Sequence, residues 1–130
     1  MNKIFSKENG QSMVEFALIM PILLLILVGI IEFGFMFSNF LTLTNASREA
    51  VRAISLGSSD ASATQRAKDT SINLDPTQIV VVINPSDSNR DPGDSVTVTI
   101  TYEYDFLTPF MERIFGSDFQ LETDTTMRVE

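Results

Sequence analysis

The stretch Phe16–Ile31, FALIMPILLLILVGII, contains no charged residue and decides the fold. Glu32 interrupts it, and further apolar residues then continue the run to Phe37. As a helix, the 22 residues from Phe16 to Phe37 rise about 33 Å, enough to cross a hydrocarbon core of about 30 Å. A chain of 130 residues is too short to enclose such a helix in a soluble core. We therefore expect it to span a membrane.

A removable secretory signal is the alternative for this stretch. Its apolar region is longer than the usual 7 to 15 residues of such signals, and no A-x-A-like cleavage site closely follows it. We expect the helix to stay in the mature protein. Lys3 and Lys7 before the stretch nearly balance Arg48 and Arg52 after it. An orientation with the N-terminus on the cytoplasmic side of the membrane is favoured, because the first flank is short and the downstream part is acidic.

Composition excludes several classes of function. The 130 residues include 9 basic and 17 acidic side chains, giving a net charge of −8, and contain neither cysteine nor histidine. Disulfide frameworks, Cys/His zinc sites, thiol nucleophiles and histidine-based triads are therefore excluded. An acidic chain is also a poor nucleic-acid binder. Because the carboxylates do not converge in sequence, we expect no enzyme, no catalytic residue and no cofactor.

Helical periodicity continues beyond the apolar stretch. Leu43, Ala46, Ala50 and Ile54 recur at steps of three and four residues, which predicts one continuous helix from about Gln11 to Leu56. Its first half would lie in lipid and its second half would be amphipathic. Gly57 and the serines after it indicate a helix end followed by a new cap. A second helix is predicted from Asp60 to about Ile72, stopped by Asp75-Pro76.

The period then changes from helix to strand. A β-branched run at 78–84 and apolar-polar alternation over 96–105 and 119–130 predict three strands. Thr108, Pro109 and Gly116 fit the cap, first residue and end of a short helix before the last strand, and Phe106, Phe110 and Ile114 would share one of its faces. The predicted fold class is α+β, with the outer half of the long helix packed on a three- to four-stranded antiparallel sheet. The predicted domains are a leader at 1–10, a long helix at 11–57 that spans the membrane over about 16–37, and an extracytoplasmic α/β domain at 58–130.

One motif lies where the chain enters the membrane. The sequence GQSMVEF at residues 10–16 follows the short, basic-leaning leader MNKIFSKEN. It resembles the prepilin-peptidase site of type IV pilin-like proteins. VEFALIMPILLLILVGIIEFG at 14–34 and TNASREAVR at 44–52 are similar to the TadE-like proteins of the tight-adherence (Tad, Flp or type IVc) pilus system. The closing TMRVE also fits this resemblance.

The resemblance implies a role for each residue of the motif. Cleavage would fall between Gly10 and Gln11, leaving Glu15 fifth in the mature chain, followed by Phe16 in the apolar helix. The protein would be a minor pilin or pseudopilin that helps to assemble the pilus in adherence and biofilm formation. Its implied partners are the prepilin peptidase, other pilin-like subunits, the Tad assembly platform and the lipid bilayer. An unpaired charge carried into the bilayer costs about 2.5 to 3.5 kcal/mol. Glu15 could therefore neutralise the new amine of a neighbouring subunit.

Simpler structural interpretations stay open for these residues. Ser12 and Glu15 also fit a capping box, in which both would cap the first turn of the helix. Pro21 removes one helical hydrogen bond, and could mark a point of melting on assembly or be a tolerated membrane proline. Glu32 could pair with a partner subunit or reach the outer interface.

Two other functions are considered. The first is a permanently anchored scaffold or binding domain of the secretion machinery, never cleaved or extracted. The second is an anchored ligand-binding or calcium-sensing module, because Asp87, Asn89 and Asp91 resemble the start of a calcium loop. Pro92 stands at the position of the required glycine, and Val98 at that of the closing glutamate, so an ordinary hairpin loop and no metal are expected.

Overall fold

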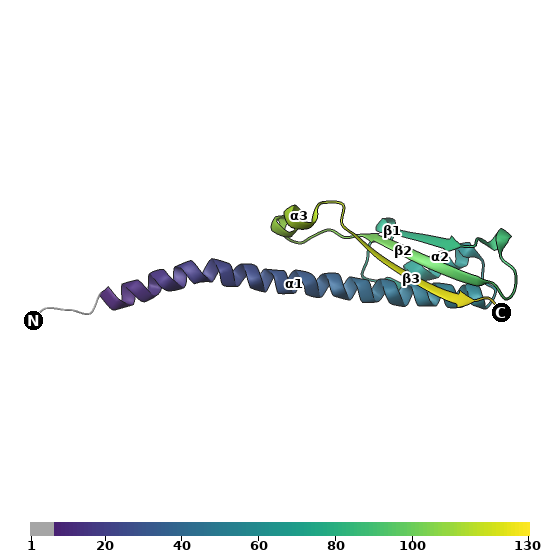
Figure 1. Cartoon of the computed structure of the whole chain (residues 1–130), viewed down its shortest axis with the longest axis horizontal. Helices are drawn as coiled ribbons and strands as arrows, with labels where there is room; N and C mark the ends of the chain where they lie inside the picture. Colours follow the sequence, from purple (N-terminus) through teal and green to yellow (C-terminus); the bar gives the residue numbers. More distant parts are fainter. Residues whose placement is uncertain (1–6) are drawn as a thin grey trace, which may run out of the picture. The chain divides into compact units, whose positions relative to one another are not determined.

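The computed structural model of the chain describes the backbone of residues 7–130 and side chains from Gly10 onward. It confirms the α+β class: a long helix is followed by a small antiparallel sheet (Figure 1). The elements in chain order are α1 (Lys7–Ser55), α2 (Asp60–Thr70), η1 (Pro76–Gln78), β1 (Ile79–Asn84), η2 (Asp87–Asn89), β2 (Ser95–Glu103), α3 (Pro109–Phe115) and β3 (Gln120–Arg128).

The chain divides into two compact units, and the boundary lies inside α1. The first ends at Gly34 and the second comprises Phe35–Glu130. In the first unit, α1 is continuous through Pro21. None of its most apolar 18-residue stretch is buried, which distinguishes it from the core helix of a soluble protein. This helix is long and apolar enough to cross a membrane.

The sheet belongs to the second unit. Its strands lie in the order β1-β2-β3 and pair antiparallel, with Val81 opposite Ile100 and Val98 opposite Thr125. The alternation predicted for 96–105 is confirmed: Val96, Val98 and Ile100 point to the core, whereas the threonines between them lie on the other face. On that outer face of β1, Val80 and Val82 are exposed.

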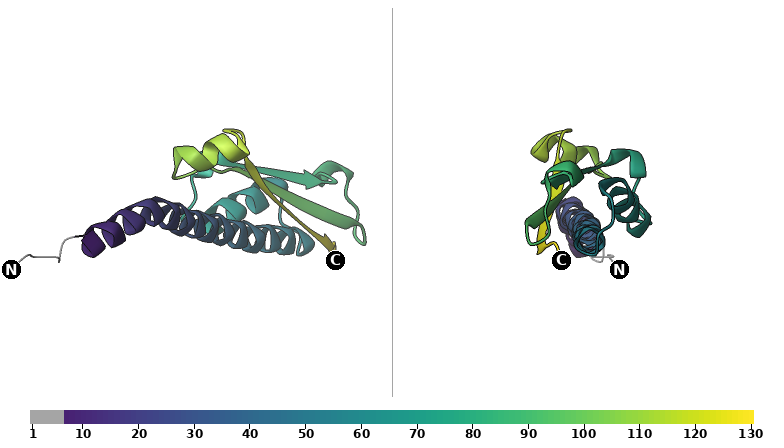
Figure 2. Two further views of the ribbon diagram at one scale, coloured as in Figure 1. Left: turned by 60° about the vertical axis from the view of Figure 1, so that its left-hand side comes forward. Right: turned by 90° about the vertical axis from the view of Figure 1, so that its right-hand side faces the viewer.

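The outer part of α1 and helix α2 cover the inner face of the sheet (Figures 1 and 2). The predicted stripe on the outer half of α1 is fully buried, as are two alanines of α2 that join the same cluster. The buried helix residues in this core are Leu43, Ala46, Ala50, Val51, Ile54, Ala63 and Ala67. Alanine allows close approach of the helices, while the β-branched residues of the sheet fill the space between them.

Hydroxyl groups form the contact between α1 and β3. Ser47 is fully buried; its hydroxyl donates to the Thr44 carbonyl at 2.9 Å and lies 2.7 Å from the Thr125 hydroxyl. The hydroxyls of Thr44 and Thr123 are 3.3 Å apart. The buried oxygens of this contact are therefore hydrogen-bonded, as burial requires.

The turn between α1 and α2 follows the predicted capping signals. Gly57 has a φ of +93°, a left-handed conformation that glycine adopts without a Cβ clash. Ser59 is the N-cap of α2, and its hydroxyl accepts a hydrogen bond from the Ser62 amide at 3.2 Å. The second helix ends at Thr70, two residues before the expected end.

The short helix α3 lies where Thr108, Pro109 and Gly116 predicted it. Thr108 occupies the N-cap position, but its side chain makes no capping hydrogen bond. The expectation that Phe106 shares a helix face with Phe110 and Ile114 is wrong, because Phe106 precedes the helix and joins an aromatic cluster. The rings in this cluster are those of Tyr104, Phe106, Phe115 and Phe119, with centroid distances of 5.3 to 5.8 Å.

Candidate processing and assembly segment

The predicted cleavage position lies in the first turns of α1. Gly10 and Gln11 are both exposed, and a Cβ built on Gly10 would meet nothing within 4 Å. The first turn of a helix lacks partners for its amide groups and frays readily. This peptide bond is therefore accessible. Residues 1–6 of the predicted leader lie outside the described residues.

Glu15 lies one turn after Gln11 on the same side of the helix. The Gln11 side-chain amide donates to the Glu15 carboxylate at 3.2 Å, and both side chains are exposed. The carboxylate is therefore placed beside the residue whose amine cleavage would expose.

The capping-box interpretation of Ser12 and Glu15 does not hold. α1 begins at Lys7, so Ser12 is its sixth residue, beyond the usual uncertainty in a helix boundary. A residue at that depth cannot act as N-cap, because its neighbours already have helical partners. The predicted start at Gln11 was late because residues 7–10 are helical as well, although they carry no apolar stripe to reveal this.

Between Phe16 and Ile31 the helix exposes large apolar side chains on all sides. Phe16 itself is exposed, and Pro21 lies inside the helix without interrupting it. An all-round apolar surface suits contact with lipid or with other apolar helices.

The family comparison decides how this segment is related to known proteins. Residues 10–52 match the family model described as TadE-like protein. This segment is TadE-like. The match confirms the resemblance over these residues; it begins at Gly10, ends before α2 and leaves the sheet outside. No curated protein and no solved structure matches the chain.

Glu32 differs from the other polar residues of the TadE-like segment. Its side chain is buried, with 2% exposed, whereas Ile31 and Phe33 on either side are about half exposed. The assembly role of Glu32 stays a prediction, as do those of Glu15, Phe16 and Pro21.

The loop after β1, outside the TadE-like segment, contains a charge cluster that sequence reasoning missed. The Arg90 guanidinium, 7% exposed, donates to Asp60 at 2.9 Å and also pairs with Asp87. The Asp87 carboxylate accepts from the Asp60 amide at 2.8 Å, and the Asp60 carboxylate accepts from the Asp87 amide at 3.0 Å. This cluster fastens the loop to the start of α2.

The cluster bears on the calcium hypothesis. Asp87, the first expected ligand, is already neutralised by Arg90 and bonded to the backbone. Within the described residues, no group of three acidic side chains is arranged to hold a metal ion. An open depression of about 430 Å³ beside the cluster is lined partly by Asp87, Arg90 and Glu130. The cation that lines this depression, the Arg90 guanidinium, already pairs with the carboxylates of Asp60 and Asp87.

Two groups in the second unit have shifted pKa values. The Thr77 hydroxyl and amide donate to the Asp75 carboxylate at 2.7 and 2.9 Å, and these bonds lower the pKa of Asp75 because they stabilise its charged form. Burial, together with the nearby charges of Asp105 and Asp75, raises the pKa of Tyr102. Asp75 thereby caps η1, and Tyr102 belongs to the core cluster.

Proposed function

We propose that this protein is a minor pilin or pseudopilin of a Tad pilus. It is inserted in the cytoplasmic membrane with its N-terminus inside and its acidic domain outside. A prepilin peptidase cleaves it between Gly10 and Gln11, and it then joins other pilin-like subunits. The observation that supports this most directly is the TadE-like match, which runs from Gly10 through the exposed apolar helix.

Cleavage creates a charged group that can pair with a neighbouring subunit. Removal of the leader creates an amine on Gln11 at the edge of the lipid. Because an unpaired charge in the membrane costs about 2.5 to 3.5 kcal/mol, a carboxylate partner selects the position of an incoming subunit. The Glu15 carboxylate is exposed, and its own Gln11 side chain bonds only one of its oxygens, so the amine of a neighbour can still approach it.

The apolar surface of α1 supplies contact area rather than selectivity. Exchange of lipid tails for apolar side chains of another helix has little hydrophobic driving force, since both surroundings are apolar. Pairing of Glu15 with an amine would therefore fix the register of helices that otherwise slide past one another. In this proposal the activity is assembly, without a catalytic step.

The cleavage site is tested with a pair of glycine variants. Gly10→Leu and Gly34→Leu each add the same side chain to α1 at a position where a Cβ meets nothing within 4 Å. Both should insert and fold. Only Gly10→Leu should accumulate as uncleaved precursor on immunoblots of native membranes. Equal cleavage of the two variants would contradict the assignment.

Recovery in filaments distinguishes the pilin from an anchored scaffold. A minor pilin should be present in pili sheared from cells, at lower abundance than the major subunit. A permanently anchored scaffold would remain wholly in the membrane fraction, even if it were cleaved.

A further inference from the structure

The second unit exposes an apolar patch that the proposed assembly role does not use. The patch consists of four large side chains on α3 and its flank, all exposed: Leu107, Phe110, Ile114 and Phe115. Met111, on the opposite side of α3, is buried. The short helix is therefore amphipathic, with its apolar outer side facing away from its own domain.

The patch is held on a firm support. The Phe115 ring stacks on Phe106 at a centroid distance of 5.6 Å and meets Phe119 edge-on at 5.8 Å. Phe106 also contacts Tyr104, whose side chain belongs to the core cluster. These contacts fix α3 to the sheet, so the exposed side chains of the patch are presented by a packed element.

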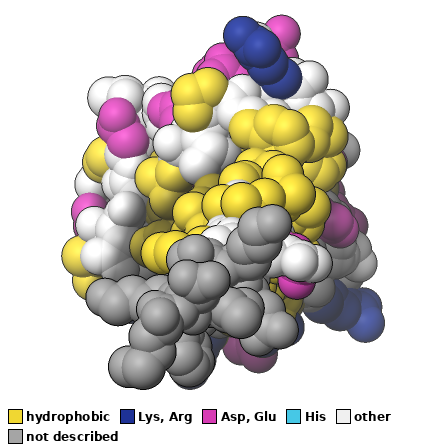
Figure 3. Space-filling view, turned by 90° about the vertical axis from the view of Figure 1, so that its left-hand side faces the viewer, with side chains coloured by type: hydrophobic (Ala, Val, Ile, Leu, Met, Phe, Trp, Pro, Cys, Tyr) yellow, Lys and Arg dark blue, Asp and Glu magenta, His cyan; other side chains and the backbone are white. Residues whose placement is uncertain are grey.

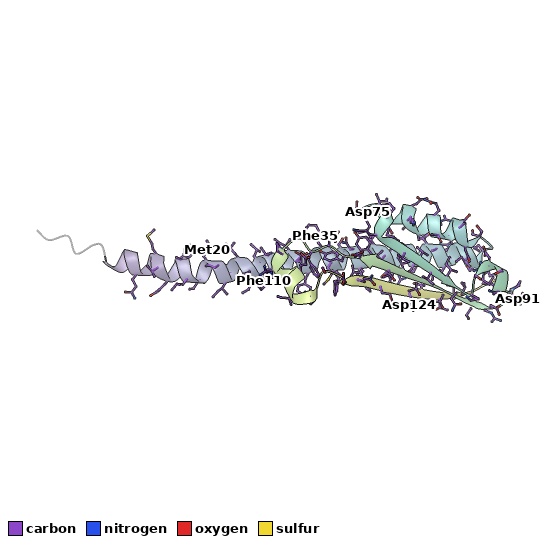
Figure 4. The ribbon with its side chains drawn as sticks, turned by 90° about the horizontal axis from the view of Figure 1, so that it is seen from above. Met20, Phe35, Asp75, Asp91, Phe110 and Asp124 are labelled. Atoms are coloured by element: carbon purple, nitrogen blue, oxygen red, sulfur yellow. The ribbon has the colours of Figure 1, made fainter. Side chains whose placement is uncertain are left out.

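The patch lies at the end of the second unit where α1 enters it. Phe35, the first residue of this unit, and Phe110 lie near this end, and Asp91 lies at the other (Figure 4). The first α1 residues of the unit are exposed and apolar too: Phe35, Phe37, Phe40 and Leu41. In Figure 3, which faces the N-terminal end of the chain, the exposed hydrophobic side chains of the first unit lie toward the viewer.

We propose that this patch inserts into the outer leaflet of the membrane that the chain itself crosses. The proposal rests on the proposed function, which places the second unit outside the membrane. A span over Phe16–Phe37 reaches the outer boundary of the hydrocarbon near Phe37. The end of the second unit that carries α3 therefore lies at the lipid headgroups.

The small area of the patch favours lipid over a protein partner. The segment contains Glu112, Arg113 and Asp118 within a chain of net charge −8. Attraction to anionic headgroups therefore does not draw α3 to the membrane, and the contact depends on the apolar side chains. A stable protein interface buries about 800 Å² on each partner, far more than one side of a seven-residue helix offers. A domain already tethered to the bilayer pays little further entropy on contact, so a small apolar surface suffices.

The absence of cysteine from the sequence makes a direct test possible. Single-cysteine variants of the full chain are labelled with an environment-sensitive fluorophore and reconstituted, one protein per nanodisc, in phosphatidylcholine. The lipid carries nitroxide near the headgroup in one set of discs, for positions 110 and 80, and in the middle of the acyl chain in a second set, for position 24. Phe110→Cys tests the patch, and Val80→Cys is the matched control, because the two side chains are 53% and 56% exposed. Leu24→Cys reports on the span.

The proposal predicts blue-shifted emission and several-fold stronger lipid quenching at position 110 than at position 80. Equal, weak quenching at both would overturn it. So would a label at 110 that is shielded from aqueous iodide but unaffected by lipid nitroxide, since that indicates burial against protein. Quenching at 24 without quenching at 110 refutes this inference alone, whereas no quenching at 24 refutes the membrane-spanning function as well.

A second set of variants keeps Phe110 in place. A label on Ser117→Cys, beside the intact patch, should be quenched by lipid nitroxide. Adding Phe110→Ser and Ile114→Ser should abolish that quenching, while circular dichroism shows an unchanged fold. Persistent quenching in the doubly substituted variant would show that the patch does not hold α3 in the lipid.

Discussion

Val98→Ala should destabilise the second unit strongly, because Val98 lies fully buried in the central strand between the sheet and α1. The substitution removes two methyl groups, worth about 1.6 kcal/mol of lost burial at about 0.8 kcal/mol each. The cavity left behind raises the loss to about 2 to 3 kcal/mol. For a domain of this size, that corresponds to a fall in melting temperature of about 10 to 20 °C.

Val82→Ala is the matched control for this change. Val82 lies on neighbouring strand β1 and points to the outer face, where 54% of it is exposed. The same atoms are lost there without a cavity, so the expected cost is about 0.5 kcal/mol or less. The melting of the full chain in detergent micelles can be followed by near-ultraviolet circular dichroism, because both tyrosines belong to the core.

The comparison tests the register of the sheet as well as its core. A shift of one residue in strand pairing would exchange the two faces of the sheet. Equal destabilisation by the two variants, or a larger effect of Val82→Ala, would refute the assignment of inner and outer faces.

Three further predictions concern assembly, pH and metal. Glu15→Val should leave insertion and cleavage intact but lower incorporation into sheared pili, whereas Ser12→Ala should assemble normally; equal defects would remove the charge-pairing role. Because the pKa of Asp75 is lowered in the fold, its stabilising effect is complete above the unfolded value near 3.8 and is lost as the pH falls through the folded value. Urea unfolding should therefore show that Asp75→Asn and Thr77→Val cost stability at pH 7 and less at pH 3. Melting curves with millimolar calcium and with chelator should coincide; a shift of several degrees would show that the loop at 87–94 binds the ion.

The sequence predicted the parts of the fold that repeat with a regular period. The buried stripe from Leu43 to Ile54 and the inward side of β2 from Val96 to Tyr102 were both evident, because burial of one face imposes a period of 3.6 or 2. Glycine and serine at 57–59 marked the turn, since few other residues suit a left-handed backbone or an N-cap.

Features that depend on tertiary contact were not predictable in this way. The pairing of Arg90 with Asp60 joins residues 30 positions apart, and nothing local in the sequence indicates it. Phe106 was assigned to a helix by its spacing, but packing against Phe115 and Phe119 places it in the aromatic cluster. For the candidate site, sequence identified Gly10 and Glu15 by resemblance, whereas the side-chain contact between Gln11 and Glu15 and the burial of Glu32 required coordinates.

The most direct test of the account is the intact mass of the protein isolated from its native membranes. The account predicts a chain that lacks MNKIFSKENG and begins at Gln11, with the entire helix and the outer domain retained. A native protein that still carries Met1–Gly10 would contradict processing as a pilin.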